Sequence, residues 1–224
     1  MWNLPAPPGF QGLHPDKPVH IYVRHLPHWR QEGATYAATF RLHDSLPQEK
    51  LNELAALRQE WERRNPPPHG DEQLAQLARA TMRRVDRWLD LGMGSCRLKD
   101  TAAAQLVVDA LHHFDGERYE LDCYVIMPNH VHVVVRPFGA IDSLEDILHS
   151  WKGYTGQRIN RLFGLHGSLW QDESFDRIIR HEEHLYRAVQ YVGANARRAG
   201  LDAGRCPRWI RTEWQRLGWQ FQET

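Results

Sequence analysis

The sequence predicts an α+β fold, a ferredoxin-like split βαβ antiparallel sheet with helices on one face, plus a helical insertion and a C-terminal helix that carries a tyrosine. Alternating apolar residues indicate strands at about 35–42, 119–126, 131–135 and 175–180. Apolar residues at helical spacing indicate helices between them. With the insertion at about 47–92 set aside, the order is strand, helix, strand, strand, helix, strand, helix, as in ferredoxin-like folds.

A first strand followed by two helices is predicted at the start of the domain. Residues 35–42 alternate, which places four apolar side chains on one face, those of Tyr36, Ala38, Phe40 and Leu42. Ser45 and Gln48 match a capping box, which predicts a helix that runs to Arg64 and stops at a proline run. A second helix is predicted over 71–89, and we interpret the two helices as an insertion in the sheet domain.

The rest of the domain continues with a helix capped near Asp100 that ends at Phe114. The next two strands are separated by residues 127–129, which are few enough for a tight hairpin. A helix is predicted over 143–163, with Gly164 as its terminator, and the last over 182–199, with acidic residues first and basic residues last.

Three parts of the chain differ in composition. Residues 1–33 contain six prolines and four histidines, which predicts an irregular N-terminal arm. Residues 34–201 contain the predicted sheet domain, and residues 202–224 form a tail rich in basic and aromatic residues.

The composition sets wide bounds on function. The 224 residues are 42% hydrophobic and 25% charged, with a formal net charge of zero, which is typical of a soluble globular protein and argues against one that coats polyanions. We find neither an apolar run of roughly eighteen residues nor a leader, so we expect a cytoplasmic protein with no membrane partner. The three cysteines are widely spaced, and we predict no disulfide.

The most informative motif is His130-Val131-His132, within an apolar run. Side chains alternate along a strand, so both imidazoles leave one face of the sheet. Two neutral imidazoles about 7 Å apart at the backbone can converge on one divalent metal ion. Taken alone, two such histidines are more often ordinary polar positions on a solvated face, so a second feature is needed.

The last predicted helix supplies that feature. Its core stripe consists of Leu185, Val189, Val192 and Ala196. Tyr191 and Asn195 lie four residues apart and share another stripe, roughly 100° around the helix axis. If that stripe faces the histidines, Asn195 can provide a third metal ligand and the Tyr191 hydroxyl lies one turn away. A metal ion and an oxygen nucleophile are what phosphodiester cleavage requires.

Other residues compete for these roles. Tyr191 alone can be a packing aromatic, and Tyr154 and Tyr186 are rival nucleophiles. Tyr186 lies about 140° around the helix from Tyr191, so the two cannot both face the metal. His184 is too far along the helix axis from Asn195 to share a metal ion with it, and we expect it only to neighbour the site.

Three motifs occur in a recognisable order. Residues 127–134 read Met-Pro-Asn-His-Val-His-Val-Val, Leu-Trp-Gln at 169–171 precedes Phe-Asp-Arg-Ile-Ile-Arg at 175–180, and Tyr-Val-Gly-Ala-Asn at 191–195 leads to Ala-Gly-Leu at 199–201. Together they resemble the single-tyrosine HUH transposases, and among these the REP-associated tyrosine transposases, which are bacterial chromosomal proteins linked to repeated extragenic palindromes. The resemblance spans about residues 34–201.

The resemblance implies a mechanism. His130 and His132 would ligate Mg²⁺ or Mn²⁺, Asn195 would complete the protein ligands, and Tyr191 would attack the scissile phosphate. The product would be a 5′-phosphotyrosine link to single-stranded DNA with a free 3′-hydroxyl. The family continues its Tyr-x-x-x-Asn motif with proline, whereas Ala196 stands here, which removes a helix breaker and is expected to leave function intact.

Basic and aromatic residues outside these motifs are candidate DNA contacts. Cations and aromatics alternate in the tail, a combination that tracks a phosphate backbone and stacks unpaired bases; the candidates are Arg205, Arg208, Trp209 and Arg211. The alternative is that the tryptophans pack on the body of the protein. Lys152, Arg158 and Arg161 on the preceding helix either touch phosphates or stay solvated.

We therefore expect a metal-dependent nickase and strand transferase that acts on single-stranded DNA at hairpin-bearing repeats, as a monomer or homodimer associated with the nucleoid. One alternative is a domesticated protein that binds repeat DNA without turnover. Another is a metal hydrolase that uses water and leaves no protein–DNA adduct.

Overall fold

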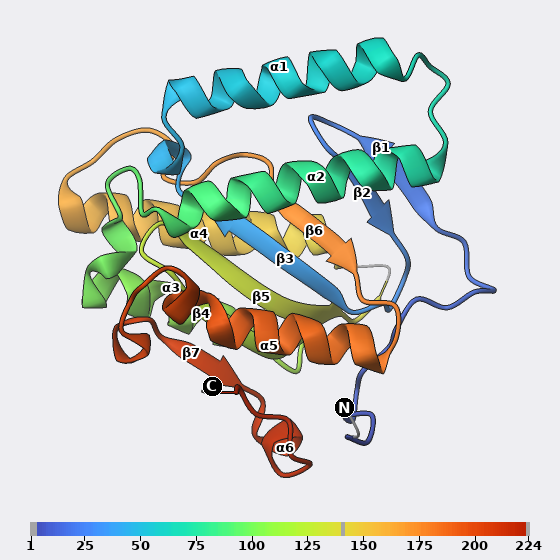
Figure 1. Ribbon diagram of the computed structural model, residues 1–224. Coiled ribbons are helices and arrows are strands. Elements are labelled where there is room, and N and C mark those ends of the chain that lie inside the picture. Colours follow the sequence, from blue (N-terminus) through green and yellow to red (C-terminus); the bar gives the residue numbers. More distant parts are fainter. Residues whose placement is uncertain (1–3, 140–141, 223–224) are drawn as a thin grey trace.

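The computed structural model describes residues 4–139 and 142–222 and has a five-stranded antiparallel sheet at its centre (Figure 1). In chain order the strands are β3 (Tyr36–Arg41), β4 (Tyr119–Ile126), β5 (His130–Pro137), β6 (Phe175–Ile178) and β7 (Arg208–Ile210). Their spatial order is β6-β3-β5-β4-β7. The first four have the ferredoxin-like order, with antiparallel pairing throughout, so the predicted fold class is confirmed.

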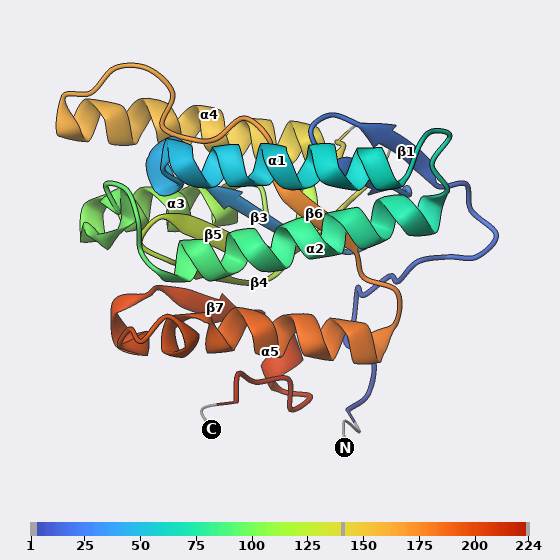
Figure 2. The same cartoon turned by 45° about the horizontal axis from the view of Figure 1, so that its top comes forward.

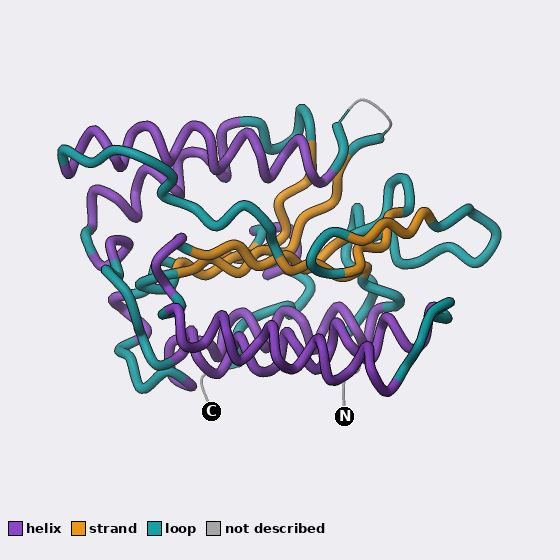
Figure 3. The backbone as a smooth tube through the Cα atoms, turned by 90° about the horizontal axis from the view of Figure 1, so that it is seen from above, coloured by secondary structure: helices purple, strands orange, loops and turns teal. Residues whose placement is uncertain are grey.

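Helices lie on both sides of this sheet, which is seen edge-on between two helical layers in Figure 3. The longer helices are α1 (Gln48–Arg64), α2 (Asp71–Asp90), α3 (Thr101–His113), α4 (Leu144–Phe163) and α5 (Glu182–Arg198). α3 and α4 cover one face, while α5 and the insertion helix α2 run side by side over the other (Figures 1 and 2). α1 packs against α2 through a small separate apolar cluster.

The alternation of strand β5 explains the two faces. Val131, Val133 and Val135 enter the core under α3 and α4, whereas Val134 enters the second core with the predicted stripe of α5. Each fully buried aliphatic side chain of this kind contributes roughly 1.5–3 kcal/mol relative to exposure. The strand faces are therefore strongly specified, because a slip of one residue would exchange them.

The turn between β4 and β5 is the predicted hairpin. Ile126 pairs with Val131, and the backbone N–H of Met127 donates to the carbonyl of His130 across the turn. Asn129 is fully buried, and its amide nitrogen donates to two carbonyls at the end of α2, those of Leu89 and Met93. The insertion is thereby attached to the start of β5.

The helix ends follow the sequence signals except at α1. Asp100 caps α3, Ser143 caps α4 in a capping box, and Gly164 ends α4 with a φ of 63°. The predicted capping box at Ser45 is wrong, because Pro47 precedes the first turn of α1 without a side-chain cap and Ser45 donates to the carbonyl of Leu42 instead.

The segment predicted to be an irregular arm contains a β hairpin. Strands β1 (His20–Val23) and β2 (Pro27–Arg30) pair antiparallel. Arg30 and His28 both bind the buried carboxylate of Asp176 on β6, so polar pairing attaches the hairpin beside the sheet edge. Such pairing leaves no apolar period in the sequence, which is why the prediction missed it.

The tail adds strand β7 to the sheet and then the short helix α6 (Thr212–Gln215). Trp214 and Trp219 are fully buried in the core beside α5. Their indole nitrogens donate to the carbonyls of Pro8 and Pro5, so the tail also fixes the start of the described chain. The packed alternative for the tail tryptophans therefore holds at these two positions. Residues 1–3 and 223–224 of the predicted arm and tail lie outside the described residues.

None of the helices in the described part of the chain has the combination of length and hydropathy that a bilayer-spanning segment needs.

Candidate functional site

The two motif histidines lie at the start of β5 and face α5. Their Nε2 atoms are 3.0 Å apart, and their rings meet edge to face. Both side chains are almost completely buried. The spacing is what a shared ion requires, because two nitrogens bound at right angles to one divalent ion at about 2.1 Å stand about 3 Å apart.

The Nδ1 atoms of both histidines have hydrogen-bond partners that orient the imidazoles. His130 Nδ1 is 2.7 Å from Asn129 Oδ1, and because the amide nitrogen of Asn129 is already donating elsewhere, His130 carries its proton on Nδ1. His130 Nε2 therefore presents a lone pair. His132 Nδ1 is 2.7 Å from the hydroxyl of Thr39 on β3, which can donate or accept. Partners of this type hold metal-binding histidines in place.

Both imidazoles are neutral at physiological pH. Burial lowers the pKa of His130 to about 3, and the positive charge of Arg198 acts in the same direction. Burial, and then the neighbouring ring of His130, lowers the pKa of His132 well below its ordinary value. Neutral imidazole is the form that binds metal ions, so the pair needs no deprotonation to act as ligands.

Asn195 of α5 lies beside this pair. The core stripe of α5 packs on the sheet, which turns Asn195 inward until none of its surface is exposed. Its amide nitrogen donates to the carbonyl of Tyr191 at 2.6 Å. Its buried Oδ1 atom has no partner within ordinary hydrogen-bond geometry, but it lies close enough to His132 to raise the pKa of that imidazole as an acceptor. A buried acceptor without a full hydrogen bond is costly unless something binds it.

Two imidazole nitrogens and an amide oxygen are a donor set that can hold a divalent metal ion. The described residues contain no group of three or more His, Cys, Asp or Glu side chains placed to hold a metal, and the candidate third ligand beside the two imidazoles is the amide oxygen of Asn195. Two imidazoles and the unpaired amide oxygen of Asn195 provide that mixed nitrogen and oxygen set. All three predicted ligands are therefore brought together.

The Tyr191 side chain lies at the same place. Its ring meets that of His132 edge to face, with centroids 5.3 Å apart, and the guanidinium of Arg198 lies 4.6 Å from its centroid. Its hydroxyl donates to Asp86 Oδ2 at 2.8 Å. Burial and then the negative charge of Asp86 raise the pKa of Tyr191, so the phenol is protonated at rest.

Cationic side chains gather around the site, which the sequence motifs did not reveal. Arg177 of β6 and Arg198 of α5 act electrostatically on His132. Arg41 of β3 is buried next to His130 in the strand register, and its guanidinium donates to Ser45 and to the carbonyl of Leu42. The Nε atoms of Arg41 and Arg177 are buried without hydrogen-bond partners. Planar guanidinium groups suit a phosphate, so the surroundings favour an anionic substrate.

The sequence offers only a weak signal for these residues. Arg177 alternates with Asp176 in the short strand β6, and Thr39 alternates with the apolar face of β3. Asp86 occupies an interior position of α2 between Val85 and Arg87. Nothing in local periodicity says which polar residues will meet at a site.

The rival residues lie elsewhere. Tyr154 is 43% exposed on α4, on the opposite side of the sheet, with the guanidinium of Arg158 over its ring. Tyr186 accepts a hydrogen bond from Gln222 and packs on Trp219. His184 accepts one from the backbone of Arg180, and the charge of Arg177, which also acts on His132, lowers its pKa after burial.

The predicted DNA contacts are not gathered into one surface. Lys152 donates to the carbonyls of Gln171 and Asp172. Arg211 binds Asp115 and the carbonyl of Leu121. The other candidates are exposed (Arg158, Arg161 and Arg205) or half-buried (Arg208 and Trp209).

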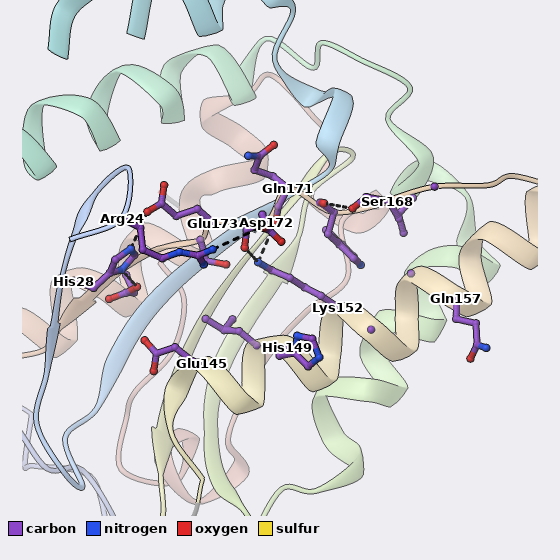
Figure 4. A pocket seen from close by; sticks show the side chains of 18 of the residues that line it. Arg24, His28, Glu145, His149, Lys152, Gln157, Ser168, Gln171, Asp172 and Glu173 are labelled. Atoms are coloured by element: carbon purple, nitrogen blue, oxygen red, sulfur yellow. Dashed lines mark hydrogen bonds and ion pairs between the residues drawn. The ribbon is translucent and has the colours of Figure 1, made fainter. Parts of the chain in front are cut away.

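A cavity of about 560 Å³ lies under α4, beside the β1–β2 hairpin (Figure 4). Its lining carries both signs of charge, with Lys152 and His28 near Glu145 and Glu173. Asp176, which also lines it, shares a sheet face with Ala38 of the α4 core. The cavity is therefore separated from the histidine pair by the sheet.

Comparisons with known proteins found one distant structural similarity. No family model matches the chain, and no curated protein matches it. Among solved structures it is similar to a REP-associated tyrosine transposase bound to a REP hairpin, with a TM-score of 0.44 and 14% sequence identity over 76% of this chain and 71% of that one. Similarity at this level identifies neither a family nor a function.

Proposed function

We propose that this protein is a metal-dependent endonuclease and strand transferase that acts on single-stranded DNA through a phosphotyrosine intermediate. The observation that carries the proposal is the meeting of Tyr191 with the His130 and His132 pair and Asn195 in one buried site. The motif resemblance of the sequence supports the same reaction. It also supports hairpin-bearing repeats as the DNA partner.

Each residue has a distinct part in this proposal. His130, His132 and Asn195 would hold Mg²⁺ or Mn²⁺, which when bound polarises the phosphate and withdraws charge from it. Tyr191 attacks phosphorus, so that a bond from its phenolic oxygen to phosphorus forms and the bond to the 3′-oxygen breaks. Arg177 and Arg198 stabilise the charge of the phosphoryl group.

The test is adduct formation. The protein is incubated with hairpin-bearing single-stranded DNA and Mn²⁺, then denatured and separated by electrophoresis. We expect a covalent protein–DNA adduct that is lost in Tyr191→Phe while DNA binding persists. Tyr186→Phe and Tyr154→Phe serve as matched controls that keep the adduct.

Other outcomes would contradict the proposal in different ways. Cleaved DNA without an adduct would assign the reaction to water. Bound but intact DNA would assign the protein to repeat binding without turnover. An adduct that survives in Tyr191→Phe and disappears in one of the control variants would move the nucleophile to that tyrosine.

A further inference from the structure

The insertion helix α2 contributes a carboxylate to the candidate site. Asp86 Oδ2 accepts the hydrogen bond of the Tyr191 hydroxyl at 2.8 Å, across the seam between α2 and α5. The two residues are 105 positions apart in the chain. No residue of α2 belongs to the motifs that identified the site, so Asp86 is an addition to the proposed metal ligands and nucleophile.

The Asp86 carboxylate has too few hydrogen-bond partners for a purely structural role. It is 8% exposed, and its other oxygen, Oδ1, is buried without a hydrogen-bond partner. The attachment of α2 to α5 is already provided one turn later, where Arg198 donates to Asp90 at 3.2 Å. A buried carboxylate with one free oxygen is costly for stability, so a role in function would explain its presence.

The reaction requires an acceptor for the phenol proton. Tyr191 is protonated at rest and must lose that proton as its oxygen bonds to phosphorus. The lone pair of His130 Nε2 is directed at His132, and both rings are committed to the metal in the proposed function. Among the described residues, Asp86 is the acceptor that the Tyr191 hydroxyl contacts.

We propose that Asp86 is the general base that removes the proton from Tyr191 during attack on the phosphate, an inference that rests on the proposed function. The phenolic O–H bond breaks and an O–H bond to Asp86 forms as the tyrosine oxygen bonds to phosphorus. The 3′-oxygen leaves with the electron pair of its bond and takes a proton from water. Asp86 then returns its proton to solvent, so the balance of protons is zero.

The surroundings of Asp86 suit this role. Tyr191 and Arg198 face it from α5, Asp90 from its own helix, and Arg177 from β6. Burial raises the pKa of Asp86 to about 6, against the hydrogen bond from Tyr191 and the charge of Arg198, which lower it. Asp86 is thus ionised at neutral pH yet a stronger base than an exposed aspartate, which is what general base catalysis favours.

The experiment compares Asp86→Asn with Asp90→Asn in the full-length protein. Asparagine keeps the size of the side chain and an acceptor for the Tyr191 hydroxyl but cannot take its proton. We expect Asp86→Asn to form adduct about 100-fold or more slowly in single-turnover reactions with Mn²⁺ and hairpin DNA, with unchanged DNA affinity. Asp90→Asn should react at close to the wild-type rate.

Two further readouts separate a base from a structural role. The wild-type adduct rate should rise as the pH passes through about 6, and Asp86→Asn should lose that rise. Without metal or DNA, the pKa of Tyr191, followed by NMR of labelled tyrosine, should fall in Asp86→Asn because a nearby negative charge is removed.

The results distinguish this inference from the proposed function. A wild-type protein that forms adduct, together with an Asp86→Asn variant that forms it equally fast, would overturn the role of Asp86 and leave the nuclease standing. Equal losses in Asp86→Asn and Asp90→Asn would also overturn it, because they would assign both residues to the packing of α2. A wild-type protein that forms no adduct would overturn both.

Discussion

Single hydroxyl and amide groups decide how the two imidazoles of the site are oriented. Asn129 fixes the proton of His130, whereas the Thr39 hydroxyl can serve either tautomer of His132. When the Nε2 of His132 binds an ion, its proton must sit on Nδ1, where Thr39 accepts it. Under the proposed function, the contact from β3 therefore supports metal affinity, although Thr39 is not itself a proposed ligand.

Thr39→Val tests that role, because valine has the shape of threonine without its hydroxyl. We expect Mn²⁺ affinity, measured by calorimetry, to fall about 10- to 100-fold. Thr39→Ser keeps the hydroxyl and should bind Mn²⁺ nearly as well as the wild type. Equal affinities in the valine variant and the wild type would show that His132 is oriented by its packing alone.

Burial of the ionised Asp86 carboxylate should lower the free energy of unfolding. Its pKa is raised from 3.8 to about 6, so the folded state keeps a proton that the unfolded state releases between these values. The contribution of Asp86 to stability therefore falls as the pH rises from about 4 to about 6 and stays lower above that range. Asp86→Asn removes this dependence, because asparagine does not titrate.

We expect Asp86→Asn to be more stable than the wild type at pH 7.5, by at most about 3 kcal/mol, with the difference vanishing near pH 4. Urea unfolding at the two pH values measures it. A variant that is less stable at pH 7.5 would mean that the ionised carboxylate is well solvated or paired in the folded protein.

At the scale of elements, the sequence predicted the strands and helices that have an apolar period. It did not predict the polar contacts that join one element to another. The faces of β3 and β5 and the core stripe of α5 follow from spacing, and with them the positions of the His130 and His132 pair and of Tyr191. Asp86, Thr39 and Arg177 were not predicted as site residues. Each is polar and comes from an element that meets the site only in the tertiary structure.

The β1–β2 hairpin is the clearest case of polar attachment. His28 Nδ1 is 2.6 Å from Asp176, and its Nε2 is 3.1 Å from Glu173. Burial by itself would lower the pKa of His28, but its hydrogen bonds with Asp176 and Glu173 outweigh burial and raise it to about 9. The imidazole is therefore protonated at pH 7 and bridges the hairpin to β6.

This bridge predicts a loss of stability in alkaline solution. Because the folded-state pKa of His28 lies above its ordinary value, its stabilisation is complete below about pH 6.5 and is lost as the pH rises through about 9. His28→Gln should be less stable than the wild type at pH 6, by about 2–3 kcal/mol, and nearly equal at pH 9.5, as measured by urea unfolding. His20→Gln, on the exposed start of the same hairpin, should match the wild type at both.

At the scale of the whole molecule, the tail belongs to the folded body. Strand β7 extends the sheet and the two buried tryptophans complete the core beside α5. Arg211 of this tail is held by Asp115, Leu121 and the ring of Trp209. Its charge is thus used within the protein. Under the proposed function, this favours a DNA path over the α5 side, where Arg177 and Arg198 face the site.

The salt dependence of DNA binding can test that path, because each contact between a cation and a phosphate contributes to the slope of log affinity against log salt. We expect Arg177→Gln to weaken binding of a labelled hairpin and to reduce the slope of log affinity against log salt by about 1, since one phosphate contact is removed. Arg211→Gln should leave that slope unchanged and lower stability instead, because it removes the ion pair with Asp115 and leaves that carboxylate with the backbone N–H of Leu121 as its donor. Fluorescence anisotropy at several salt concentrations gives both slopes. The opposite pattern, a reduced slope in Arg211→Gln only, would place the DNA along β7 and separate DNA binding from the tyrosine site.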